Sequence, residues 1–112
     1  MDINVRNRNN VRVITLRGDL RLGDALNSFR EITDNLVEEG NHHFLLNLGE
    51  VRMIDSSGVG LLIKLMASAK KAGGTVKLAN PSDFVVKSLR LVGLLSLFEV
   101  FPDDESAFAS FQ

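Results

Sequence analysis

One short run of the sequence holds residue types that could carry chemistry, Asp55-Ser56-Ser57-Gly58-Val59-Gly60. It follows apolar residues typical of a strand, and an apolar helical pattern continues after it. Asp and Ser side chains accept hydrogen bonds from the unpaired N–H groups at a helix start, and such a cap contributes about 1 kcal/mol. The same helix end also favours a phosphate group. Local chemistry therefore leaves two roles for Ser56 and Ser57, a helix cap or a phosphorylation site, and by itself favours the cap.

A serine at a strand-to-helix turn is also typical of hydrolases, whose nucleophile lies between two glycines. Neither Ser56 nor Ser57 has a glycine on both sides. The only histidines are the adjacent pair His42 and His43, at the start of the preceding predicted strand. A strand that runs toward Ser56 places these histidines at its opposite end, so Ser56 lacks the base that hydrolysis needs. We therefore expect no enzymatic activity.

Composition argues against several classes of ligand. The Gly58-Val59-Gly60 segment lacks the third glycine of a dinucleotide-binding fingerprint, and the chain has no Gly-Lys-Ser or Gly-Lys-Thr of a P-loop. Cysteine is absent and no cluster of acids and histidines has ligand spacing, so neither a metal nor another cofactor is expected. The net charge of −1, from 13 basic and 14 acidic residues, does not favour nucleic acid or an anionic membrane. The apolar runs are too short for insertion into a bilayer.

Hydrophobic periodicity predicts the elements that position the serine run. Strands are predicted at residues 3–5, at 11–17 with Gly18-Asp19 at its end, at 44–48 with a brief extension at 51–54, at 75–79 and at 97–101. Helices are predicted from Leu22 to Gly40, from about Ser57 to Ala72, from Pro81 to Gly93 with Asn80 as its cap, and after Pro102. The asparagines of residues 7–10 predict a hairpin turn between the first two strands.

The order of these elements predicts the fold class. Strands that alternate with helices need crossover connections, so most of the sheet is parallel, and only the first strand pairs antiparallel with the second. We expect an α/β fold with a mixed, mostly parallel sheet of about five strands and about four helices. A length of 112 residues is consistent with one domain over residues 1–112.

The run LNLGEVRMIDSSGVG, residues 46–60, resembles the signature of STAS domains of the anti-sigma factor antagonist type, a family of bacterial regulators. Other segments are similar to this family too: Gly18-Asp19-Leu20, Gly73-Gly74, Leu91-Val92-Gly93-Leu94, Phe98-Glu99-Val100-Phe101 and Asp104-Glu105-Ser106-Ala107. The resemblance covers nearly the whole chain.

The resemblance implies a cytoplasmic phosphoprotein that acts by partner switching in signal transduction and transcription regulation. The unphosphorylated protein would bind an anti-sigma factor that is a serine kinase with a histidine-kinase-like ATPase fold. That kinase would phosphorylate Ser56 and release the protein, and a PP2C-type phosphatase would remove the phosphate. Asp55 would orient the serine or help the kinase to dock, and Gly58 and Gly60 would allow its close approach. The expected partner-binding residues are Asp55, Ser57, Gly58, Gly60, Lys64, Asp19 and Arg21.

The segment Gly18-Asp19-Leu20-Arg21 departs from the family pattern, because many relatives carry an acid where this chain has Arg21. In the expected fold this segment lies near Ser56, so the guanidinium of Arg21 could pair with a phosphate. We hypothesise that Arg21 weakens the electrostatic effect of phosphorylation. An alternative function is a scaffold STAS subunit that binds a transporter or a signalling complex without being phosphorylated.

Overall fold

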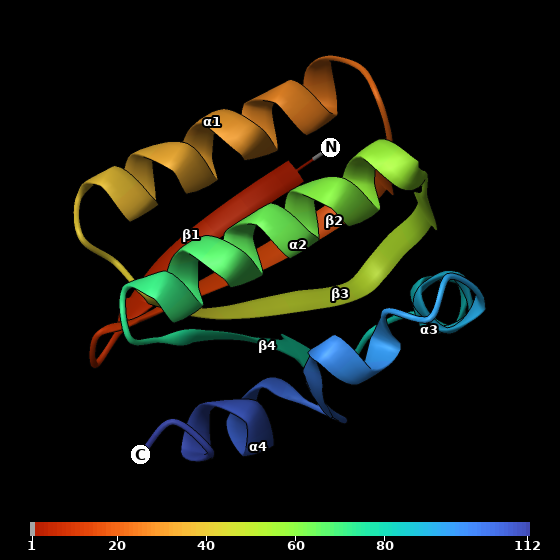
Figure 1. Ribbon diagram of the computed structural model, residues 1–112. Helices are drawn as coiled ribbons and strands as arrows, with labels where there is room; N and C mark the ends of the chain where they lie inside the picture. Colours follow the sequence, from red (N-terminus) through yellow and green to blue (C-terminus); the bar gives the residue numbers. More distant parts are fainter. Residues whose placement is uncertain (1) are drawn as a thin grey trace.

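The computed structural model describes residues 2–112, which form one five-stranded sheet with helices on both faces (Figure 1). The strand order is β1-β2-β3-β4-β5, with β1 antiparallel to β2 and the other neighbouring pairs parallel. The predicted α/β class with a mixed, mostly parallel sheet is confirmed. In chain order the elements are β1 (Asp2–Arg8), β2 (Val11–Leu20), α1 (Asp24–Glu38), β3 (His43–Ile54), α2 (Ser56–Lys71), β4 (Thr75–Ala79), α3 (Asp83–Leu91), a 3-10 turn (Leu95–Leu97), β5 (Glu99–Phe101) and α4 (Asp104–Ala109).

The first two strands form a hairpin in which all seven residues of β1 pair with β2, from Asp2 opposite Arg17 to Arg8 opposite Val11. The two residues between the strands, Asn9 and Asn10, have φ angles of 48° and 68°. A two-residue turn with positive φ at both positions matches the twist of the strands, and asparagine tolerates that backbone conformation. The hairpin turn predicted from the asparagines is therefore confirmed.

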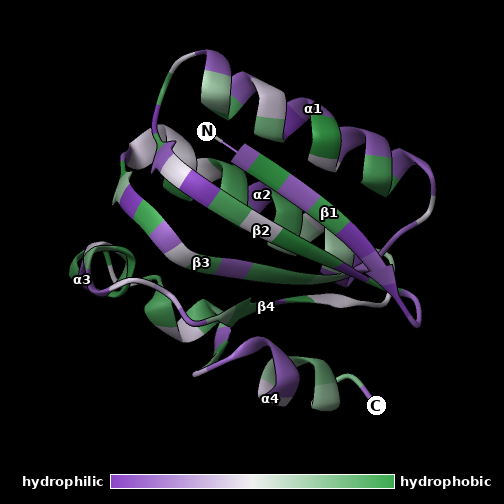
Figure 2. Ribbon diagram, turned by 180° about the vertical axis from the view of Figure 1, so that it is seen from behind, coloured by the Kyte–Doolittle hydropathy of each residue, from purple (hydrophilic) through white to green (hydrophobic). Residues whose placement is uncertain are grey.

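The main hydrophobic core lies between one face of the sheet and helices α1, α2 and α3. Figure 1 shows α1 and α2 side by side over this face. The central strand β3 contributes several fully buried side chains to it, which explains its nearly continuous apolar run. Figure 2 shows the alternation of hydrophilic and hydrophobic residues along β1, which is typical of a strand with one solvated face.

A smaller core covers part of the opposite face of the sheet, where α4 packs. Lys77 of β4 lies within it, and its ammonium donates hydrogen bonds to the carbonyl and the hydroxyl of Ser110, at 3.0 and 2.8 Å. The same ammonium pairs with Glu99 at 3.0 Å and lies 4.5 Å from the centre of the Phe111 ring. Lys77 is only 7% exposed, so one buried charge ties the C-terminal segment to the sheet. The small core consists of Val11, Val13, Leu45, Ala79, Ala107 and Phe108.

Several predicted boundaries differ from the structure. The second strand continues through Gly18-Asp19 to Leu20, because it pairs with a β3 strand that runs unbroken from His43 to Ile54. Helix α1 begins at Asp24, not at Leu22, and the side chain of Leu22 is 72% exposed. The last strand is shorter than predicted, since Leu95–Leu97 forms a 3-10 turn before it.

The predicted cap of α3 was also wrong. The hydroxyl of Ser82 accepts the Val85 N–H and donates to the Val51 carbonyl at 2.6 Å, so Ser82 is the cap and the helix begins at Asp83. Asn80 instead has a φ of 49° and its N–H donates to the carbonyl of Phe101. It therefore belongs to the turn that leaves β4.

Candidate functional site

The carboxylate of Asp55 joins two segments at the end of β3. One oxygen accepts the Gly58 N–H at 2.9 Å and so caps α2, which begins at Ser56. The other oxygen accepts the Leu22 N–H at 2.9 Å, and the Asp55 N–H donates to the carbonyl of Leu20. The predicted serine cap is therefore wrong, because the aspartate occupies the cap position. Asp55 also ties the loop between β2 and α1 to the start of α2.

These hydrogen bonds determine the protonation state of Asp55. The N–H groups of Leu22 and then Gly58 stabilise the carboxylate and lower the pKa of Asp55 below its ordinary value. The side chain is thus an anion at neutral pH, held one residue before Ser56. A negative charge near the start of a helix also interacts favourably with the helix dipole.

The side chain of Ser56 is exposed at the first residue of α2. The Ser56 hydroxyl has no hydrogen-bond partner among residues 2–112. The backbone N–H of Gly58, which a serine cap could bind, already donates to Asp55. Ser57 is half-buried at the next position. The hydroxyl of Ser57 has no hydrogen-bond partner among residues 2–112 either, so exposure distinguishes the two serines: Ser56 presents its hydroxyl to solvent at a helix start whose cap does not depend on it.

The two glycines of this run have different surroundings. Gly58 is buried, and a Cβ atom there would lie 2.2 Å from the carbonyl oxygen of Leu20 and 2.9 Å from Ile54. We expected Gly58 to allow close approach of a partner, but its lack of a side chain allows α2 to pack against the end of β2. Gly60 is exposed and has nothing within 4 Å of the position of a Cβ. Only Gly60 is thus open to a partner.

The other predicted residues lie next to each other here, Asp19 near the end of β2 and Arg21 in the loop that Asp55 holds. A shift of the β2–β3 register lies between Gly18 and Asp19, and Gly18 has a φ of 119°. Such an irregularity re-aims the side chains near the end of a strand. Asp19 forms ion pairs with both Arg21 and Arg52, at 3.7 and 3.8 Å. Arg52, an exposed residue of β3, was not among the predicted residues. Two arginines, Arg21 and Arg52, thus share the single carboxylate of Asp19.

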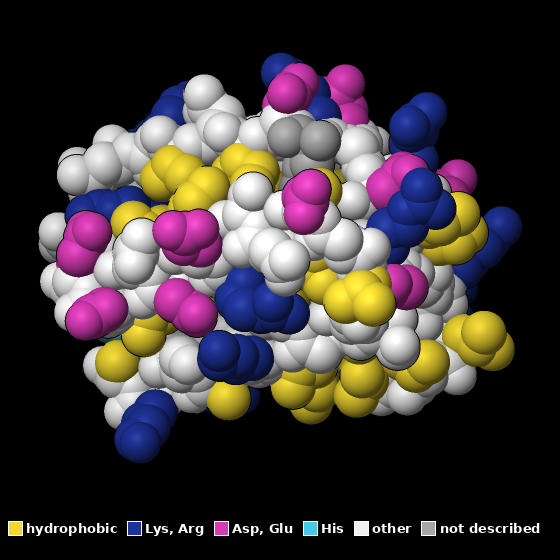
Figure 3. Space-filling model, turned by 90° about the horizontal axis from the view of Figure 1, so that it is seen from above, with side chains coloured by type: hydrophobic (Ala, Val, Ile, Leu, Met, Phe, Trp, Pro, Cys, Tyr) yellow, Lys and Arg dark blue, Asp and Glu magenta, His cyan; other side chains and the backbone are white. Residues whose placement is uncertain are grey.

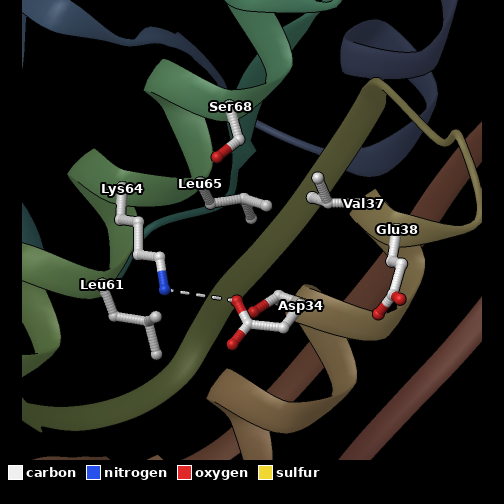
Figure 4. A pocket seen from close by; sticks show the side chains of 8 residues that line it. Asp34, Val37, Glu38, Leu61, Lys64, Leu65 and Ser68 are labelled. Atoms are coloured by element: carbon white, nitrogen blue, oxygen red, sulfur yellow. Dashed lines mark hydrogen bonds and ion pairs between the residues drawn. The ribbon is translucent and has the colours of Figure 1, made fainter.

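Lys64 lies farther along α2 and is engaged with α1. Its ammonium lies 3.4 Å from a carboxylate oxygen of Asp34 (Figure 4). A hollow of about 280 Å³ between the two helices surrounds this pair. The side chain of Lys64 is still 59% exposed, so it could meet a partner only by sharing or leaving the ion pair with Asp34.

A second hollow, of about 370 Å³, lies directly beside Ser56, between the start of α2 and the end of α3. Leu91 and Val92 line it and are 88% and 55% exposed. The predicted helix ran to Gly93, but α3 ends at Leu91, so Val92 lies beyond the helix. In the sequence, the apolar pair Leu91-Val92 stands directly before Gly93, which ends the predicted helix. This position at a helix end was the available indication that both side chains could be exposed. The lining consists of Ile54, Asp55, Ser56, Val59, Ser88, Leu91, Val92 and Leu94.

The two histidines lie at the other end of the same strand. His43 is the first residue of β3, whereas Ser56 follows its last residue. Neither histidine is therefore in a position to act as a base for Ser56. Among residues 2–112, no helix combines the length and the apolar character needed to cross a bilayer.

The site thus consists of an exposed serine at a helix start, an aspartate that caps this helix, and a loop tied to that aspartate. The family model of the STAS domain matches residues 2–107, which include all of these features. The chain belongs to the STAS domain family. This STAS domain resembles the anti-sigma-B factor antagonist of Bacillus subtilis (strain 168), with 29% identity over 108 residues that cover 94% of this chain and 96% of that protein.

Solved structures of STAS proteins have the same fold. The anti-sigma factor antagonist SpoIIAA in its unphosphorylated form has a TM-score of 0.86 and 25% identity, covering 98% of this chain and 96% of that chain. The phosphorylated form of the Bacillus SpoIIAA has a TM-score of 0.81 and 24% identity, covering 99% and 100%. A sulfate transporter family protein from Wolinella succinogenes shares the fold at a TM-score of 0.75 and 20% identity, covering 92% and 85%.

Proposed function

We propose that this STAS domain is an anti-sigma factor antagonist that is switched off by phosphorylation of Ser56. In its unphosphorylated form it binds, in the cytoplasm, an anti-sigma factor that is a serine kinase with a histidine-kinase-like ATPase fold. The kinase transfers a phosphate to Ser56, which releases the complex, and a PP2C-type phosphatase restores the hydroxyl. The observation that carries this proposal is the exposed Ser56 hydroxyl, which has no hydrogen-bond partner among residues 2–112.

The local structure supports a phosphate that changes the surface without unfolding the domain. The cap of α2 is made by Asp55, so modification of Ser56 removes no hydrogen bond of the helix. A phosphate adds about −1.5 to −2 charge, which the N-terminus of α2 partly offsets and the Asp55 carboxylate opposes. The main result is a new local negative potential, and a partner surface shaped for a neutral hydroxyl would reject it.

The residues around Ser56 support a docking surface of mixed character. The hollow lined by Leu91 and Val92 could accept an apolar side chain of the kinase, and the exposed Gly60 could allow close backbone approach. Arg21 and Arg52 would face acidic groups of the partner, with Asp19 held between them. Ser57 and Lys64 extend the proposed surface along α2. Asp55 acts mainly through the position of Ser56 and of the loop.

Mass spectrometry of the intact protein after incubation with a candidate anti-sigma factor kinase and ATP tests the proposal. The wild type and Ser57→Ala should each gain the mass of one phosphate, and Ser56→Ala should gain none. A phosphate on Ser56→Ala would place the modification elsewhere. If none of the three proteins gained mass although the kinase was bound, a scaffold role without phosphorylation would be favoured.

The role of Arg21 needs a separate measurement. If its guanidinium offsets part of the added charge, Ser56→Asp should weaken kinase binding less than Ser56→Asp combined with Arg21→Asp. The single variant Arg21→Asp is the control for direct contacts of this residue with the kinase. Equal losses of affinity in the single Ser56→Asp variant and the double variant would contradict the hypothesis.

A further inference from the structure

We propose that this domain forms a symmetric dimer through the free edge of β1, which joins the sheets of two copies into one. Within residues 2–112, β1 pairs only with β2 and is the edge of the sheet. It has seven residues, no proline, and no irregularity in its register with β2. Its outer N–H and C=O groups can therefore accept another strand, and a second β1 in antiparallel orientation is self-complementary.

An exposed edge strand is usually protected by charge, and β1 carries Arg6 and Arg8. Helix α4 neutralises both of them within the same chain. Arg6 lies 3.7 Å from Asp104, and Arg8 binds both carboxylate oxygens of Glu105, at 2.9 and 3.1 Å. The guanidinium of Arg8 also lies 3.8 Å from the centre of the Phe108 ring. The arginines therefore add no net repulsion that would keep a second copy away.

The charges along this face of the sheet fit one register of the dimer. Glu50 of β3 pairs with Arg17 of β2 at 2.5 Å, and Arg17 is opposite Asp2 of β1. If the twofold axis passes through Val5, Asp2 of each copy is opposite Arg8 of the other. The charges then alternate in sign across the interface, from Glu50, Arg17 and Asp2 of one copy to Arg8 and Glu105 of the other. Opposite charges that face each other across an antiparallel pair stabilise it.

The other face of β1 is compatible with the same register. Side chains alternate between the faces of a strand, so Val5 lies on the side of Ile3, which packs against the main core. Val5 is 38% exposed, and the dimer would cover it with its own symmetry mate. Figure 3, which looks down on α1, shows Lys and Arg side chains together with Asp, Glu and hydrophobic side chains on this side of the molecule. The two Ser56 sites would lie at opposite ends of the joined sheet, since the two β1 strands run in opposite directions.

Single cysteines test the register, since the wild type has none. Val5→Cys should form an intermolecular disulfide under mild oxidation, because opposed residues of an antiparallel pair have Cα atoms about 4.5 to 5.5 Å apart, within the range of a disulfide. Val100→Cys is the matched control, since Val100 lies on the other edge strand and is 42% exposed. Cross-linking of Val5→Cys should be about tenfold faster or more, because association raises the effective thiol concentration. Equal rates for the two variants would overturn the proposal, and cross-linking of Asn4→Cys in place of Val5→Cys would overturn this register.

Analytical ultracentrifugation of the wild type provides a second measurement that needs no cysteine. Sedimentation should show a dimer that dissociates on dilution, and Asp2→Arg should weaken it by about tenfold, since like charges would then be opposite each other twice. Circular dichroism verifies that Asp2→Arg is folded. A wild type that stays monomeric up to millimolar concentration, or an Asp2→Arg dimer of unchanged affinity, would overturn the proposal.

Discussion

The carboxylate of Asp55 accepts the backbone N–H of Leu22 at 2.9 Å, and so joins the β2–α1 loop to the residue before Ser56. The second oxygen of the same carboxylate caps α2 through the N–H of Gly58. One side chain thus holds both segments that flank the proposed phosphorylation site. The position of the loop and the start of the helix are therefore coupled through Asp55.

Replacement of Asp55 should be costly for stability, whereas replacement of Ser56 should not. Asp55→Ala removes the cap of α2 and the acceptor of the Leu22 N–H, and we expect a loss of about 1–2 kcal/mol in the free energy of unfolding. Ser56→Ala removes an exposed hydroxyl without a partner among residues 2–112, so its change should stay within about 0.5 kcal/mol. Urea denaturation of both variants measures these values. A large loss in Ser56→Ala would mean that this hydroxyl belongs to the cap.

The stabilisation by Asp55 should depend on pH. Hydrogen bonds from Leu22 and Gly58 lower the pKa of Asp55 in the folded protein, so the folded state favours the carboxylate. The contribution to stability is complete above the unfolded pKa of about 3.9 and is lost as the pH falls through the folded pKa. The stability difference between wild type and Asp55→Asn should thus be largest near neutral pH and shrink below about pH 4. A difference that stays constant down to the acid transition would contradict this assignment.

The two glycines of α2 should respond in opposite directions to alanine. Gly58→Ala places a methyl group against the carbonyl of Leu20, and we expect a loss of roughly 1–3 kcal/mol. Gly60→Ala meets open space in a helix interior and should gain about 0.5–1 kcal/mol. Thermal unfolding compares the two variants directly. If Gly60→Ala is more stable but binds the kinase more weakly, the bare backbone at Gly60 serves the partner and not the fold.

The general fold and the position of Ser56 could be predicted from the sequence, but the roles of individual side chains at the turns could not. Periodicity shows where helices and strands alternate, because burial imposes it on each element separately. Capping depends on which of several adjacent polar residues reaches an N–H. The cap of α2 was therefore considered for Ser56 or Ser57 although Asp55 makes it, and Asn80 was preferred to Ser82, whose second bond goes to Val51 of a distant strand. The packing of Gly58 against Leu20 is likewise a tertiary contact with no local signature.

The attachment of α4 should depend on Lys77. Lys77→Met keeps most of the apolar stem but leaves the carbonyl of Ser110 and the carboxylate of Glu99 without their cation. We expect a loss of roughly 1.5–3 kcal/mol, the usual contribution of hydrogen bonds to a charged group. In Lys77→Met, backbone hydrogen exchange should rise first in α4. The matched control, Lys87→Met, changes an exposed lysine and should leave the protection of α4 unchanged. Unchanged protection of α4 in Lys77→Met would mean that the apolar contacts of Phe108 suffice.

The burial of Lys77 also gives the domain an internal chemical marker. Of the five lysines, at positions 64, 70, 71, 77 and 87, only Lys77 is buried. An amine-reactive reagent should therefore label the other four and spare Lys77 for as long as the C-terminal segment stays docked on the sheet. The rate at which the label appears on Lys77 itself, read by peptide mapping because the α-amino group also reacts, would then report the opening of this segment, in the free domain or in a complex, without any mutation.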